Sequence, residues 1–269
     1  MAESFNEQPS KTFIQSFHEG LRLKLQGKYS EAIDRFQICL ENEATDDATH
    51  FALAQTYLLM GNLDLAEVHT LSAVKADIDN LFYKVELAYM LREKEAFNEA
   101  AELFELISAS RTRKTEYYLA AIDCYKMAGS YSRAIKVIES LERVKGNHLE
   151  AAIRKHRIYI EMGKVKEAEK VLLSFYTKSP KNTMILASLV DFYFQNEEDV
   201  KAVKMLEELV VEDPENGMGL LMLAEYEYQQ GNIKKTGDYF YQAIISENIT
   251  VKETVSAFDY LVHYQENER

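Results

Sequence analysis

The six histidines come first, because imidazole groups can bind metal ions and transfer protons. None of them belongs to an H-E-x-x-H motif, and none stands at metal-ligand spacing from a cysteine. We therefore expect packing or surface roles for all six and no metal site, with His156 at a position that contacts a paired helix. The histidines are His18, His50, His69, His148, His156 and His263.

Other signatures of catalysis are also missing from the sequence. It has no G-x-G-x-x-G, no P-loop and no G-x-S-x-G, so nothing indicates a nucleotide site or an activated nucleophile. The acidic run 197–199 falls in an expected turn and is interpreted as a solvated loop. The sequence thus predicts no catalytic residue, no cofactor and no metal, hence a non-enzymatic protein. A weaker alternative is an accessory domain of a longer enzyme.

Composition and charge narrow the class of partner. The chain has 269 residues, of which 31 are Lys or Arg and 44 are Asp or Glu, so its formal charge is −13. This charge repels phosphate backbones and anionic bilayers, so we expect a protein partner and no nucleic acid. No apolar run approaches the length that would insert into a membrane. With only 3 prolines and 10 glycines, the composition favours long helices.

The two cysteines fall in separate expected helices, far apart along the chain. Cys39 and Cys124 are therefore predicted to be buried free thiols that form no disulfide. Free thiols of this kind do not indicate a compartment.

One short pattern recurs along the chain. The segment 27–32, GKYSEA, returns as 61–66, GNLDLA, and as 129–134, GSYSRA. Its last residue marks an anchor, and successive anchors are 34 residues apart. The anchors are Ala32, Ala66, Ala100, Ala134, Ala168, Ala202 and Thr236. Such a period indicates stacked copies of one supersecondary unit.

Each unit contains two stretches of helical apolar spacing, separated by a short break. Gly61 and its equivalents suit the left-handed residue that ends the first helix. Ser30, Asp64 and Ser132 are expected to cap the second helices. Glu95 and Glu197 replace the glycine in two units, so we expect looser or differently shaped turns there.

The anchor position calls for a small side chain, because paired helices approach to roughly 8–10 Å. Thr236 is therefore the weakest anchor, and the neighbouring Gly237 lowers helix propensity further.

Together these features resemble the tetratricopeptide repeat, over residues 13 to about 265. The alternation of large and small residues is clearest in Leu53-Ala54…Tyr57…Gly61…Leu63…Ala66…Thr70…Ala73. The resemblance implies an all-α, right-handed superhelical solenoid of seven 34-residue helix-turn-helix repeats plus a C-terminal helix. The expected repeats are 13–46, 47–80, 81–114, 115–148, 149–182, 183–216 and 217–250. Residues 1–12 are expected to be a flexible leader, and 251–269 a capping helix or a truncated eighth repeat.

A narrower resemblance is to repeat lipoproteins of Bacteroidetes-type bacteria. It rests on residues 20–32, GLRLKLQGKYSEA, and on 213–217, DPENG, followed by 221–226, LMLAEY. Those proteins are anchored through an N-terminal lipidated cysteine, which has no counterpart here. The resemblance implies the periplasmic face of the outer membrane, and without it we expect a cytoplasmic protein.

In tetratricopeptide folds the first helix of each repeat lines the inner face, so the resemblance implies a binding groove there. One ladder of positions is entirely apolar: Phe17, Phe51, Val85, Leu119, Ile153, Ala187, Leu221 and Val255. The ladder four residues later is mixed: Leu21, Gln55, Tyr89, Asp123, Arg157, Asp191, Glu225 and Asp259. The apolar ladder could equally be packed between adjacent helices.

The leading hypothesis is a scaffold that binds a partner peptide or helix in this groove. Its candidate residues are Phe17, Phe51, Leu58, Phe82, Tyr89, Arg92, Asp123, Arg157, Asp191, Phe194, Glu225, Tyr228 and Asp259. An apolar anchor would bind near Phe51, Phe82 and Tyr89, and basic groups would face the acidic end. The ladders lack the lysines and asparagines of a carboxylate clamp. The alternative is an assembly module that stacks or self-associates through its end hairpins, with Phe258 and Leu261 on the last helix.

Overall fold

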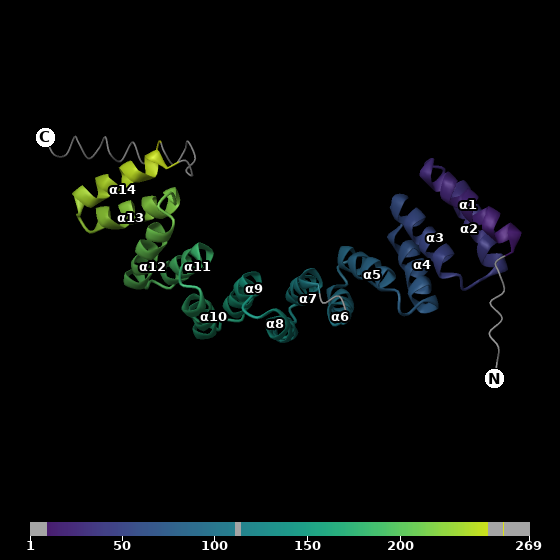
Figure 1. Cartoon of the computed structure of the whole chain (residues 1–269), viewed down its shortest axis with the longest axis horizontal. Coiled ribbons are helices and arrows are strands. Elements are labelled where there is room, and N and C mark those ends of the chain that lie inside the picture. The colour runs from purple at the N-terminus through teal and green to yellow at the C-terminus, as the bar shows by residue number, and fades with distance from the viewer. Residues whose placement is uncertain (1–9, 111–113, 247–254, 256–269) are drawn as a thin grey trace. The chain divides into compact units, whose positions relative to one another are not determined.

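The computed structural model describes residues 10–110, 114–246 and 255. Over these residues the regular structure consists of α-helices and no strands (Figure 1). The first eight helices are α1 Lys11–Leu25, α2 Tyr29–Asn42, α3 Asp47–Leu59, α4 Leu63–Ala76, α5 Leu81–Glu93, α6 Phe97–Ser108, α7 Thr115–Met127 and α8 Tyr131–Lys145. The remaining six are α9 Leu149–Glu161, α10 Val165–Lys178, α11 Thr183–Gln195, α12 Asp199–Glu212, α13 Gly217–Gln229 and α14 Ile233–Ile245.

The helices follow each other as pairs, one pair to each expected 34-residue repeat, which confirms the all-α repeat fold. The chain divides into two compact units, residues 1–144 and 145–269, and each is described by itself. Most of the expected leader and nearly all of the expected C-terminal helix, including Phe258, Asp259 and Leu261, lie outside the described residues. Among the helices that are described, none combines the length and the hydropathy needed to span a bilayer.

The anchor residues hold each pair together. All six anchor alanines, from Ala32 to Ala202, are completely buried. Thr236 is also buried, and its hydroxyl donates to the Asn232 carbonyl at 3.1 Å. A small residue is needed because the two helices of a pair approach most closely at this position.

The turns at Glu95 and Glu197 keep the same shape as the glycine turns, so the expectation of looser turns was wrong. Glu95 has φ 60° and Glu197 φ 58°, close to the 75° of Gly61. The amide after Glu95, that of Ala96, donates to the Leu91 carbonyl at 2.9 Å, as Asn62 donates to Tyr57. Helix packing thus imposes the left-handed conformation on residues that ordinarily avoid it.

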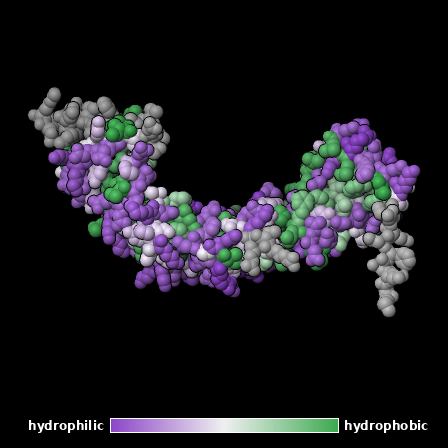
Figure 2. Space-filling view, in the orientation of Figure 1, coloured by the Kyte–Doolittle hydropathy of each residue, from purple (hydrophilic) through white to green (hydrophobic). Residues whose placement is uncertain are grey.

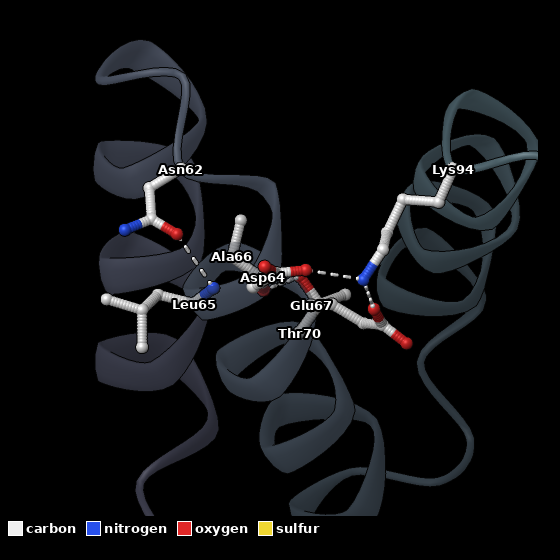
Figure 3. Close-up of polar contacts among 7 residues, drawn as sticks. All are labelled: Asn62, Asp64, Leu65, Ala66, Glu67, Thr70 and Lys94. Atoms are coloured by element: carbon white, nitrogen blue, oxygen red, sulfur yellow. Dashed lines mark hydrogen bonds and ion pairs between the residues drawn. The ribbon is translucent and has the colours of Figure 1, made fainter.

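The expected N-caps of the second helices were also wrong. Asn62 caps α4, because its side-chain oxygen accepts from the Leu65 amide at 3.1 Å (Figure 3). Asp64 lies inside α4 and instead contacts Lys94 Nζ at 2.8 Å, which joins α4 to the next repeat. Ser30 and Ser132 are likewise the second residues of their helices.

Each unit has its own hydrophobic core. In the first unit, Leu23, Phe36 and Leu53 pack together between the opening helices. In the second, a larger cluster of buried residues extends from Ala152 to Leu223. Cys39 and Cys124 are buried free thiols, as predicted.

Candidate functional site: the outer side of the first helices

Four positions of each first helix lie on one side of the helix and are not among its fully buried residues. In α1 they are Ile14, Phe17, Leu21 and Lys24, whereas Phe13, Ser16, Gly20 and Leu23 are buried. These four positions and their 34-residue equivalents are called the first-helix face. The spacing of three, four and three residues places them on one side of a helix.

The side chains of the apolar ladder are mostly neither fully exposed nor fully buried. Its members from Phe17 to Leu221 are all half-buried, and Val255 is exposed. In the first unit the ladder rests partly on the core, because Phe17 packs against Phe36 with ring centroids 5.9 Å apart. The ladder therefore forms the apolar floor of the first-helix face.

The next ladder is more open to solvent. Leu21 and Gln55 are half-buried, and the members from Tyr89 to Glu225 are exposed. Lys24 Nζ donates to Gln55 Oε1 at 2.7 Å, which joins α1 to α3 across this face. Asp259 lies outside the described residues.

Aromatic side chains of α3 and α5 meet on the face of the first unit. The ring of Phe51 lies 5.1 Å from Phe82 and 4.8 Å from Tyr83. Phe82 is 54% exposed although it is a large apolar residue. Figure 2 shows hydrophobic surface over this part of the first unit. Tyr83 is buried, and its position is fixed by a hydrogen bond that its hydroxyl donates to Asp47 Oδ2 at 2.8 Å.

About two to three turns beyond Phe82 along α5, an aromatic ring and a cation lie together. The Arg92 guanidinium carbon lies 4.9 Å from the centre of the Tyr89 ring. Tyr89 also packs edge-on against Phe104 of the core, with ring centroids 5.1 Å apart. Leu58 is half-buried, and Asp123 is exposed at the position equivalent to Tyr89. This part of the face offers a packed aromatic ring with the Arg92 cation over it, and the equivalent position on the next first helix carries an acid, Asp123.

In the second unit the face contains a groove of about 360 Å³ between α11 and α13. Three predicted residues, Asp191, Phe194 and Glu225, line it. Met222 and Tyr226 contribute further to its walls. Of the other predicted residues in this unit, Arg157 on α9 and Tyr228 on α13 are exposed but do not line the groove.

Three exposed residues of this face were not among the predicted candidates. Ile14, Met184 and Met218 occupy the position equivalent to Phe82 and are 41%, 56% and 49% exposed. The signal was available, because the 34-residue period that identified the ladders also relates these residues to Phe82. Exposed methionines are adaptable contact residues, so they extend the apolar surface of the second unit.

The structure gives His156 the packing role that its position predicts. Its Nδ1 lies 3.1 Å from the carbonyl oxygen of Ala168, on the paired helix, and its ring packs edge-on to Phe192. Burial lowers the pKa of His156. In the described part of the chain, no three His, Cys, Asp or Glu side chains are placed to hold one metal ion.

The sequence matches one family model over residues 93–175, that of subunit 3 of the anaphase-promoting complex, or cyclosome. That match covers less than half of the chain. No curated protein matches the sequence.

Solved structures share the fold at low identity. One is the C-terminal part of a tetratricopeptide-repeat protein from Cytophaga hutchinsonii, which matches with a TM-score of 0.57 and 14% identity. The match covers 90% of this chain and 98% of that one. The Naa15/Naa10 complex bound to HypK-THB matches over 95% of this chain, with a TM-score of 0.63 and 16% identity. The present chain spans only 36% of that matched chain. These likenesses establish the tetratricopeptide-repeat fold.

Proposed function

We propose that this chain, which has the tetratricopeptide-repeat fold, is a non-enzymatic scaffold that binds a segment of a partner protein on the first-helix face. The observation that carries this proposal is the exposed aromatic surface of Phe82 beside Phe51. A monomer rarely leaves a large aromatic ring half open on a contiguous apolar surface unless a partner covers it.

The first unit supplies the apolar contact of the proposed site. Phe51 and Tyr83 support the ring of Phe82 from one side and leave its other side open. A supported ring loses little conformational entropy on binding, which is why such residues dominate interface energies. A leucine, isoleucine or aromatic side chain of the partner is the chemistry that fits this surface.

The second unit supplies a charged contact. The groove between α11 and α13 brings the carboxylates of Asp191 and Glu225 beside the ring of Phe194. A lysine or arginine would place its aliphatic stem on the ring and its charged end near the carboxylates. We therefore expect the partner segment that binds here to contain basic residues.

The assembly alternative remains a prediction. The helix that motivates it lies outside the described residues. Self-association through the end hairpins would appear as a concentration-dependent increase in mass, whereas the scaffold proposal needs no second copy.

Affinity capture from the native cell extract tests the proposal, with the partner identified by mass spectrometry. Phe82→Glu is expected to lose the partner, because it places a charge in the apolar contact. Asp191→Lys combined with Glu225→Lys is expected to weaken retention, because it reverses the charge of the groove.

Matched controls are available on the second helices. Val200→Glu changes an exposed aliphatic residue that is 81% accessible, and Glu167→Lys with Asp238→Lys reverses two exposed carboxylates in the second unit. Circular dichroism confirms folding of every variant. Retention by both face variants and loss by a control would place recognition elsewhere and refute the proposal.

A further inference from the structure

We propose that the chain has a second interaction surface, on the outward side of α4, that takes a basic amphipathic segment of a partner. Leu65, Val68 and Leu71 form this surface, here called the α4 stripe, and are 40%, 55% and 36% exposed. It belongs to a second helix and so is distinct from the first-helix face. The inference does not depend on the function proposed above.

The α4 stripe is not needed to pack the helix. Ala66, Thr70 and Ala73 form the inner side of α4 and are buried. Leu65 points away from Lys94 and the contact with the next repeat (Figure 3). The inner side of α4 packs within its own repeat, and Asp64 contacts Lys94 of the next repeat. Leu65, Val68 and Leu71 take part in neither contact and remain partly exposed.

Other repeats have polar residues at the same positions. Among the second helices that the structure describes, only α4 has aliphatic residues at all three positions. On the other helices these positions are polar or charged, except for Leu173 on α10 and Tyr241 on α14. The equivalents are Glu31, Asp34 and Gln37 on α2, Glu99, Glu102 and Glu105 on α6, Arg133, Lys136 and Glu139 on α8, Glu167, Lys170 and Leu173 on α10, Lys201, Lys204 and Glu207 on α12, and Lys235, Asp238 and Tyr241 on α14. A repeat thus folds with charged residues there, so the fold alone does not explain the aliphatic triplet.

Neighbouring second helices lie side by side close to these positions. Arg133 of α8 contacts Glu102 of α6 at 2.6 Å, and Lys201 of α12 contacts Glu169 of α10 at 3.4 Å. The repeat register therefore places the α4 stripe between the rows of α2 and α6. The equivalent residues on α2 and α6 are acidic, with the exception of Gln37.

The acidic residues at these positions of α2 and α6, here called the acidic border, determine the kind of partner that fits the α4 stripe. A lysine- or arginine-flanked apolar segment would pair with the border while its aliphatic residues cover the stripe. A second copy packed about a twofold axis would bring acidic rows against each other, and an anionic bilayer would be repelled. Lys28 and Arg133 offset part of the border but leave its sign acidic.

Peptide display on the full-length chain tests the inference. A random helical peptide library is selected for binding to the wild type and counter-selected against Val68→Glu combined with Leu71→Glu. These two changes install the residue type that α6 carries at the same positions, so the variant should fold. The enriched peptides should combine apolar residues at helical spacing with Lys or Arg, and the variant should bind them about tenfold or more weakly.

The outcomes separate this surface from the first-helix face. Phe82→Glu should leave binding of the selected peptides unchanged. The inference is overturned if no peptide is enriched, if the enriched peptides are acidic, or if Phe82→Glu abolishes their binding. It is also overturned if the wild type, but not the variant, dimerises in sedimentation or binds vesicles of phosphatidylserine.

Discussion

The imidazole rings of His50 and His69 face each other, with their Nδ1 atoms 3.0 Å apart. His50 Nε2 also lies 3.0 Å from the carbonyl oxygen of Ala44. A carbonyl only accepts, so His50 donates from Nε2 and its Nδ1 must accept the proton of His69 Nδ1 when both rings are neutral. The ring of His69 stacks on Tyr57 at 5.5 Å, which holds the pair in place. Two protonated rings cannot keep this contact.

The stability of the fold should fall as the pH drops below the ordinary histidine value of about 6.5. Burial, followed by the neighbouring His50, lowers the pKa of His69, and burial also lowers that of His156. The unfolded chain then binds protons more readily than the folded chain, so acid favours unfolding. The measurement is the free energy of unfolding in urea between pH 7.5 and 5. His69→Gln should make the decline shallower, whereas His18→Gln, at an exposed site, should not.

The two left-handed glutamates should carry a cost that glycine removes. Glu95→Gly and Glu197→Gly are each expected to stabilise the chain by about 1 kcal/mol, because glycine adopts positive φ without strain. Gly129→Ala, at φ 68°, should destabilise it by a similar amount. Chemical denaturation measures both. Destabilisation by the glutamate-to-glycine changes would mean that the turns are not strained.

The anchor of the last repeat should be improvable. Thr236→Ala is expected to raise the free energy of unfolding by about 0.5 kcal/mol, because alanine has the higher helix propensity. The reverse change, Ala134→Thr, should lower it, since that site is completely buried among tightly packed neighbours. If Ala134→Thr raised the free energy of unfolding as Thr236→Ala does, the close-approach explanation would be contradicted.

Neither cysteine should react while the chain is folded. Burial raises the pKa of the Cys39 thiol, and it raises that of Cys124 to about 11. The reactive thiolate is therefore scarce as well as inaccessible. Titration with a chromogenic disulfide at pH 8 should show no fast phase in the native protein and two thiols in denaturant. Fast labelling of one thiol in the native state would contradict the burial of that side chain.

The sequence predicts the fold well because its signal is periodic. A small anchor every 34 residues must recur wherever equal helix pairs stack, so the helix pairs and the buried alanines could be expected in advance. The turns at Glu95 and Glu197 could not, because neighbouring helices dictate their backbone conformation against local preference. The cap at Asn62 was missed for a related reason. Asp64 is of a residue type that often caps helices, but its carboxylate pairs with Lys94 of the next repeat, and Asn62 caps α4 instead.

The candidate site was only partly predictable. Ladder spacing identified the side of the helix, and in the second unit two ladder residues, Asp191 and Glu225, line one groove together with Phe194. It did not reveal that Phe82 is more open than Phe51, because exposure depends on which side chains of adjacent helices cover each other. The 34-residue period relates Met184 and Met218 to Phe82, so these two exposed residues could have been identified from the sequence but were not.

Photo-crosslinking tests the central claim most directly. Benzoylphenylalanine is introduced singly at positions 82 and 184 of the first-helix face, and at 200 and 211 of the second helices, all four of them exposed. Each protein is irradiated with the partner that the wild type captures. Our account predicts crosslinks to the partner from position 82 or 184 and none from 200 or 211. Crosslinks from 200 or 211 alone would contradict it.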